Sequence, residues 1–156
     1  MAVNRGKQFE DVIKASFENI PGVSIDRLHD QTTGYMGSRN ICDFIVYKKP
    51  HEFYIECKSV HGNTLPFSNI TDNQWKGLLD KSKIPGVYAG VICWWVDKDI
   101  TAFISIQELE ECKRNGYKSI RFNHEPFYSN GMIHIPGKKK RVFFDYFMND
   151  LFLRIM

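Results

Sequence analysis

The 156-residue sequence lacks the features that mark membrane, secreted and repetitive proteins. No apolar run approaches the roughly 20 residues that a helix needs to span a bilayer, and no basic-then-apolar leader opens the chain. No internal repeat or low-complexity stretch is present. The length suits one domain, so we expect an intracellular, cytoplasmic and soluble protein with a single domain over residues 1–156.

The sequence also lacks the cysteine and histidine spacings of common zinc motifs. No two cysteines lie at the short spacing of a zinc clip, and no histidine has a helical partner or a cysteine at metal-binding spacing. The residues concerned are Cys42, Cys57, Cys93, Cys112, His29, His61, His124 and His134. We therefore expect reduced core thiols, and neither zinc chemistry nor an HNH-type site.

Positive charge is in small excess, so its position is more informative than its amount. The formal net charge is +3, from 21 Lys and Arg against 18 Asp and Glu, which is a weak indication of an anionic partner. The only dense basic run is Lys138, Lys139, Lys140 and Arg141. This run could neutralise phosphates along a duplex, and a solvated hairpin tip explains it equally well.

Hydrophobic residues make up 43% of the chain, and their periodicity predicts an α/β fold with a mixed central β-sheet flanked by helices. We expect helices over 3–19, from an N-cap at Thr71 to about 83, and from 105 or 106 to 114. We expect strands over 23–28, 41–47, 53–58, 87–96 and 100–104. Residues 30–40 and 61–70 are predicted loops. The remaining tail mixes a basic hairpin with an apolar segment, 143–156.

The strands predicted over 41–47 and 53–58 form a hairpin whose register brings three charged side chains together. If the turn is centred between Lys49 and Pro50, Asp43 lies directly opposite Glu56. Cross-strand Cβ atoms are about 4.5–5.5 Å apart, so two carboxylates there repel each other unless a cation or proton bridges them. Lys58 lies two residues beyond Glu56 and therefore on the same face of the sheet.

Two carboxylates and a lysine are the groups that metal-dependent phosphodiester hydrolysis uses. Carboxylate oxygens suit Mg²⁺, which completes its shell with water and substrate phosphate oxygens. The lysine could hold or deprotonate the attacking water. An ordinary exposed hairpin is the alternative, but the aromatic strand before Glu56 predicts burial, and buried charges need a partner or a function.

The spacing of Asp43, twelve residues, then Glu56, Cys57 and Lys58 resembles the PD-(D/E)xK nuclease motif. The segment from Asn4 and Arg5 to Glu10 and Asp11 resembles the first helix of the RecU Holliday-junction resolvases. Pro66, Asn69, Ile70 and Gln74 resemble the loop and helix start that follow the Glu and Lys in that family. With only 32 residues between Glu10 and Asp43, too few for the long stalk of RecU, the chain resembles a compact, phage-type version.

This resemblance implies roles for particular residues. Asp43 and Glu56, with the Cys57 carbonyl, would bind Mg²⁺, for which Mn²⁺ may substitute. Lys58 would activate water. Glu10 and Gln74 would support the site, and Glu10 is also a possible metal ligand. The residues expected to contact DNA, from the resemblance or from their charge, are Arg5, Lys7, Lys138, Lys139, Lys140 and Arg141.

Three functions follow as hypotheses. The first is a homodimeric endonuclease that resolves four-way junctions by paired symmetrical nicks during DNA recombination and repair, in the cytoplasm of a bacterial or phage-infected cell. The second is a nuclease of the same restriction-endonuclease-like core that cuts flaps or duplex DNA. The third is a catalytically silent DNA-binding module.

Overall fold

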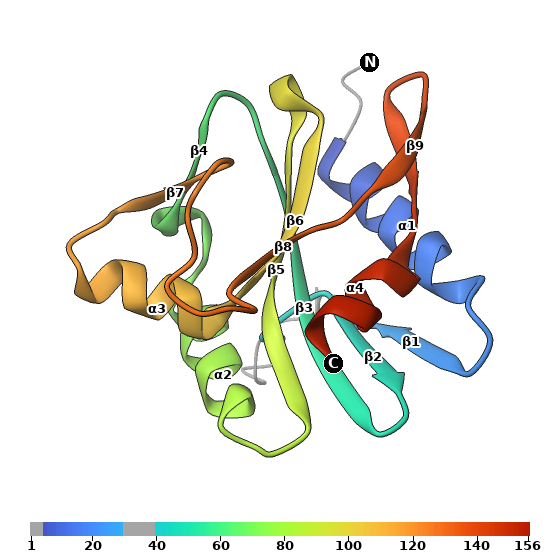
Figure 1. Ribbon diagram of the computed structural model, residues 1–156, viewed down its shortest axis with the longest axis horizontal. Coiled ribbons are helices and arrows are strands. Elements are labelled where there is room, and N and C mark those ends of the chain that lie inside the picture. The colour runs from blue at the N-terminus through green and yellow to red at the C-terminus, as the bar shows by residue number, and fades with distance from the viewer. Residues whose placement is uncertain (1–4, 30–39) are drawn as a thin grey trace.

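The computed structural model describes residues 5–29 and 40–156, so most of the predicted 30–40 loop and the first four residues lie outside the described part. The centre of the fold is a six-stranded sheet in the order β1-β2-β3-β5-β6-β8 (Figure 1). Its strands are β1 (Val23–Arg27), β2 (Phe44–Lys48), β3 (His51–Val60), β5 (Val87–Trp95), β6 (Ile100–Ser105) and β8 (Met132–His134).

The sheet is mixed, as the sequence predicts. β3 and β5 are parallel, and the other neighbouring pairs are antiparallel. A parallel pair needs a crossover, and α2 (Asp72–Ser82) supplies it between β3 and β5. The α/β class with a mixed, helix-flanked sheet is therefore confirmed.

The helices cover the two faces of the sheet and define two cores (Figure 1). α1 (Arg5–Glu18) and α4 (Met148–Ile155) pack on one face. α2 and α3 (Ile106–Arg114) pack on the other. Because side chains alternate along a strand, Phe53, Ile55 and Cys57 of β3 enter the first core. Glu56, between the last two, faces the second helical layer.

The register of the β2–β3 hairpin is the one predicted. Tyr47 pairs with Glu52, and Phe44 pairs with Ile55. The regular strand begins only at Phe44, three residues later than the predicted start, so the direct pairing of Asp43 with Glu56 stays a prediction.

One predicted loop contains additional elements, and the tail forms the predicted basic hairpin. The predicted loop over 61–70 contains β4 (Thr64–Pro66), which pairs with β7 (Ser119–Arg121), and the 3-10 turn η1 (Phe67–Asn69). The tail forms a hairpin of β9 (Gly137–Lys140) and β10 (Phe143–Tyr146), followed by α4. β4 and β7 lie far apart in the sequence, so local periodicity does not reveal their pairing.

The expectation of free thiols in the core is confirmed. Trp94 and Trp95 are fully enclosed, and all four cysteines are buried free thiols. In the last segment Phe152 packs inside, whereas Phe147 and Leu153 remain exposed. Among the described helices, none is both long enough and apolar enough to cross a membrane. A second 3-10 turn, η2 (Val96–Lys98), links β5 to β6.

Candidate active site

The hairpin holds the Asp43 carboxylate at the point where β2 begins. The backbone N–H of Asp43 donates to the carbonyl of Ile55 at 3.1 Å, the residue that already pairs with Phe44, so regular β2–β3 pairing ends at this point. Asp43 Oδ2 in turn accepts the N–H of Cys57 at 2.8 Å. The backbone of β3 therefore orients one oxygen of this carboxylate, next to Glu56.

The Glu56 carboxylate is buried and its two oxygens have different surroundings. The residue is only 4% exposed. Its Oε2 accepts from Gln74 Nε2 at 3.0 Å and lies 3.0 Å from the ammonium of Lys58. Its Oε1 is enclosed and has no hydrogen-bond partner among the described residues. Unpaired buried carboxylate oxygens are costly, so Oε1 is the atom at which a cation or proton would be most stabilising.

The electrostatics of the pair agree with this geometry. Burial, followed by the negative charge of Asp43, raises the pKa of Glu56 from 4.5 to about 8, although Lys58 acts in the opposite direction. Near neutral pH the metal-free site therefore retains a proton that a divalent cation would displace. Hard carboxylate oxygens are the donors that Mg²⁺ prefers, so the residues present fit this ion.

Gln74 belongs both to the site and to the first turn of α2. Its backbone N–H donates to Thr71 Oγ1 at 3.1 Å, and its side-chain oxygen accepts the backbone N–H of Thr71 at 3.1 Å. These two bonds form a capping box, which satisfies otherwise unpaired donors at the helix start. The box fixes the Gln74 side chain so that its remaining amide group points at Glu56.

Glu10 approaches Asp43 from α1. Together with Lys7 of the same helix, it lines a cavity of about 460 Å³ whose wall includes Asp43. In the described part of the chain, the carboxylates of Glu10, Asp43 and Glu56 do not form a group with ligand atoms within 4.8 Å of one another. Glu10 thus borders the site through Asp43, and its role stays a prediction.

Arg27 also lines this cavity, and no motif in the sequence indicates it. Its guanidinium donates to Asp11 at 2.6 Å, and it lies over the ring of Phe44. It is placed there by β1, whose pairing with β2 brings the end of one strand beside the start of the other. The adjacent Leu28 donates its N–H to the carbonyl of Asp43.

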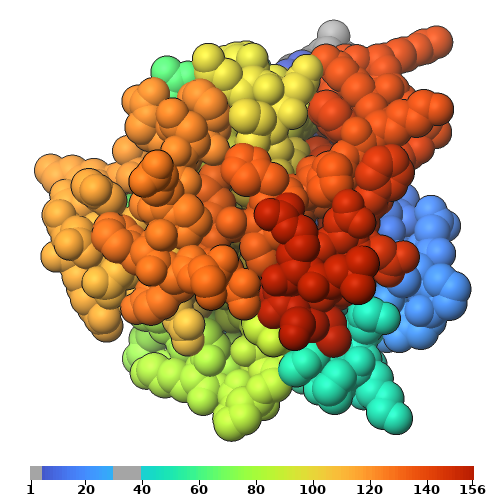
Figure 2. Space-filling view, viewed as in Figure 1, coloured from blue at the N-terminus to red at the C-terminus, as the bar shows by residue number. Residues whose placement is uncertain are grey.

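The predicted DNA-binding residues fall on two neighbouring elements. Arg5 and Lys7 are exposed on the first turns of α1, and the lysine-rich run lies on the β9–β10 hairpin. α1 contacts β10, and Figure 1 shows the hairpin beside this helix. In the space-filling view the hairpin forms a corner of the molecule (Figure 2). The two basic segments are therefore close in space, although they lie at opposite ends of the chain.

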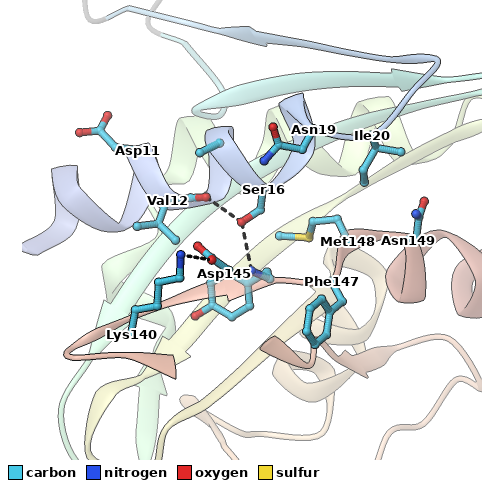
Figure 3. Close-up of a pocket in the computed structure, with 12 residues that line it drawn as sticks. Asp11, Val12, Ser16, Asn19, Ile20, Lys140, Asp145, Phe147, Met148 and Asn149 are labelled. Atoms are coloured by element: carbon cyan, nitrogen blue, oxygen red, sulfur yellow. Dashed lines mark hydrogen bonds and ion pairs between the residues drawn. The ribbon is translucent and has the colours of Figure 1, made fainter. Parts of the chain in front are cut away.

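A groove of about 620 Å³ separates α1 from the hairpin and the start of α4 (Figure 3). Ser16 joins its walls, since its hydroxyl donates to the Val12 carbonyl at 2.8 Å and accepts the N–H of Tyr146 at 3.2 Å. Lys140 forms an ion pair with Asp145 across the hairpin. This groove is not lined by any residue of the candidate active site, namely Glu10, Asp43, Glu56, Lys58 and Gln74. We therefore interpret it as the space left where the hairpin packs against α1.

His61 lies just beyond the end of β3, and its side chain pairs with an acid outside the candidate active site. Its Nδ1 is 3.1 Å from Asp97 Oδ1, and both side chains are exposed. Asp97 also accepts the N–H of Gly62 at 2.7 Å. This pair links the ends of β3 and β5 rather than extending the acidic site.

Comparisons with known proteins find little similarity in sequence. No protein-family model matches the chain, and no curated protein sequence matches it significantly. Among solved structures, the chain is similar to Hjc, a Holliday junction resolvase of the archaeal hyperthermophile Archaeoglobus fulgidus. The two share 18% identity, with a TM-score of 0.49, over 66% of this chain and 78% of that one. At this level the likeness by itself assigns no activity to the chain.

Proposed function

We propose that this protein is a Mg²⁺-dependent endonuclease that cuts branched DNA, with four-way junctions as its main substrate. The observation that carries the proposal is the Glu56 carboxylate. It is buried close to the Asp43 carboxylate, with both hydrogen-bond donors on Oε2 and none of the described residues on Oε1. A site used only for binding DNA has no reason to bury paired acids, because acids repel a polyanion.

In this proposal each residue of the network has a distinct role. Asp43 and Glu56 hold the metal, together with the carbonyl of Cys57, while Gln74 keeps Glu56 oriented. When bound, Mg²⁺ supplies charge stabilisation at the scissile phosphate and a more acidic water. The ammonium of Lys58, 21% exposed in its side chain, would hold the attacking water by a hydrogen bond and offset the negative charge that develops on the phosphate. Glu10 borders the same cavity and supports Asp43.

The branched substrate and the dimer are supported by the sequence resemblance to RecU rather than by the site. A two-fold homodimer would present two such sites and could nick opposing strands of a four-way junction symmetrically. Arg5, Lys7 and the basic run from Lys138 to Arg141 would neutralise phosphates of the arms. Such an enzyme would act in DNA recombination and repair in the cytoplasm.

The deciding experiment compares labelled four-way junction, flap, linear duplex and single strand, each with Mg²⁺, with Mn²⁺ or with chelator. We expect metal-dependent, symmetrical nicking of the junction in preference to the other substrates. Cutting of all substrates alike would favour a nuclease of broader specificity. Tight binding without any cutting would favour the silent DNA-binding module. Sedimentation of the protein with and without junction tests the dimer.

Asp43→Asn is the matched variant for this assay. It should abolish cleavage yet preserve or strengthen junction binding, because it removes a negative charge near phosphate without changing the size of the side chain. Cleavage is measured by gel electrophoresis and binding by fluorescence anisotropy on the same labelled junction. Normal cutting by this variant would place the active site elsewhere.

A further inference from the structure

A second cluster of possible metal ligands lies outside the candidate active site. Glu108 and Cys112 are one turn apart on α3 and point to the same side, because residues at i and i+4 share a helix face. His124 joins them from the segment that follows β7. Glu108 and Cys112 are fully buried, and the His124 side chain is 10% exposed. The cluster is therefore almost completely shielded from solvent.

The distances within the cluster resemble those of a zinc site. One ligand atom from each residue lies within 4.8 Å of the other two. Cys112 Sγ is 3.6 Å from His124 Nε2. Zinc–sulfur and zinc–nitrogen bonds of about 2.3 and 2.0–2.1 Å at a tetrahedral angle would place these two atoms about 3.6 Å apart. His124 Nε2 is 2.7 Å from Glu108 Oε2, so that pair would separate slightly around an ion.

The surroundings of Glu108 have the form of a supporting shell around a metal ligand. The backbone N–H of Phe127 donates to Oε2 at 2.8 Å, and that of Tyr128 donates to Oε1 at 3.0 Å. Gly131 lies so close to the Glu108 carboxylate that a side chain there would collide with it. The rings of Tyr117 and Phe127 pack beside His124. Ligating carboxylates are commonly held by such secondary hydrogen bonds and apolar neighbours.

We propose that Glu108, Cys112 and His124 form a zinc-binding site that fastens the segment over 117–131 to α3. A thiolate, an imidazole and a carboxylate form a donor set suited to Zn²⁺, with water in the fourth position. The carboxylates at Asp43 and Glu56 form a harder donor set that suits Mg²⁺. The protein would thus hold two different ions at two separate places, and the zinc site does not depend on the proposed nuclease activity.

Zinc binding is tested on the full chain carrying Asp43→Asn, which weakens metal uptake at the acidic site. Co²⁺ is the probe, because cobalt bound to a thiolate gives a charge-transfer absorption that carboxylate ligands do not. We expect this band to appear with one Co²⁺ per chain and to disappear when Zn²⁺ is added. Zinc should also raise the melting temperature, by roughly 5 °C or more at a hundredfold excess over its dissociation constant.

Cys112→Ser and His124→Ala should each remove the band and the zinc-dependent rise in melting temperature. Cys42→Ser is the matched control, because Cys42 is the thiol next to Asp43 and should leave both unchanged. Failure of the unsubstituted cluster to bind either ion would overturn the proposal, whether or not the variants fold. A band that survives in Cys112→Ser, or that disappears in Cys42→Ser, would overturn it as well.

Discussion

At the scale of single residues, the unequal surroundings of the two Glu56 oxygens explain how a carboxylate can be buried here. Gln74 and Lys58 both lie on Oε2 and offset part of its desolvation cost. The same burial and the neighbouring Asp43 charge make the metal-free carboxylate a strong proton acceptor. The ionised Glu56 carboxylate is therefore poorly stabilised unless a metal ion is bound.

This imbalance predicts how the stability of the metal-free protein depends on pH. The pKa of Glu56 rises on folding from 4.5 to about 8, so between these values the folded chain holds a proton that the unfolded chain has lost. The contribution of Glu56 to the free energy of unfolding is complete below about pH 4.5. It declines by up to about 1.4 kcal/mol per pH unit as the pH rises towards 8.

Urea unfolding in chelator at a series of pH values measures this contribution. The wild-type free energy of unfolding should fall relative to that of Glu56→Gln as the pH rises from 5 to 8, because glutamine does not titrate. With saturating Mg²⁺ the difference should shrink, since the ion replaces the proton. Parallel curves for the two proteins in chelator would contradict the raised pKa.

At the scale of elements, the first turn of α2 couples helix capping to the acidic site. Thr71 and Gln74 cap the helix reciprocally, and the amide of Gln74 also reaches Glu56 on β3. A single turn therefore fixes both the start of the helix and the orientation of the proposed metal ligand.

Substitutions at these two positions should separate the two roles. Thr71→Ala removes the cap but no contact with Glu56, so it should lower the free energy of unfolding by about 1 kcal/mol and leave cleavage largely intact. Gln74→Ala should cost a similar amount of stability and also reduce junction cleavage, measured as the rate at saturating metal. Equal cleavage rates in the two variants would mean that Gln74 acts only as a cap.

At the scale of the whole molecule, the small net charge is less important than its distribution. The N-terminal turns of α1 and the β9–β10 hairpin place basic side chains from both ends of the sequence on adjacent elements. Two lysines of the hairpin form ion pairs at 2.7 Å, Lys139 with Asp99 and Lys140 with Asp145. Lys138, for which no such ion pair is observed among the described residues, is the best position at which to test phosphate contact.

Lys138→Gln should weaken junction binding and lower its dependence on salt. For each phosphate contact removed, the slope of log affinity against log salt concentration should decrease by about 0.9. Lys83→Gln is the control, because Lys83 lies at the far end of α2, where its side chain is exposed beside Asp80. Fluorescence anisotropy at several salt concentrations gives both slopes, and equal slopes would exclude the hairpin from the binding surface.

The sequence by itself determined the features that depend on local periodicity and turn chemistry. The bounds of α2, β5 and α3 agree with the predicted ranges to within a residue or two, because caps and apolar runs specify them. The hairpin register from Phe44–Ile55 to Lys48–His51 follows from a two-residue turn and the period of two along a strand.

Only the tertiary structure decided the contacts between segments that are far apart in the sequence. It placed both donors on one oxygen of Glu56, put Arg27 in the cavity beside Asp43, and paired β4 with β7. It also brought His124 to Cys112, although their spacing of twelve residues matches no zinc motif. Such contacts arise from the packing of helices and strands against shared cores, and no local pattern in the chain encodes them.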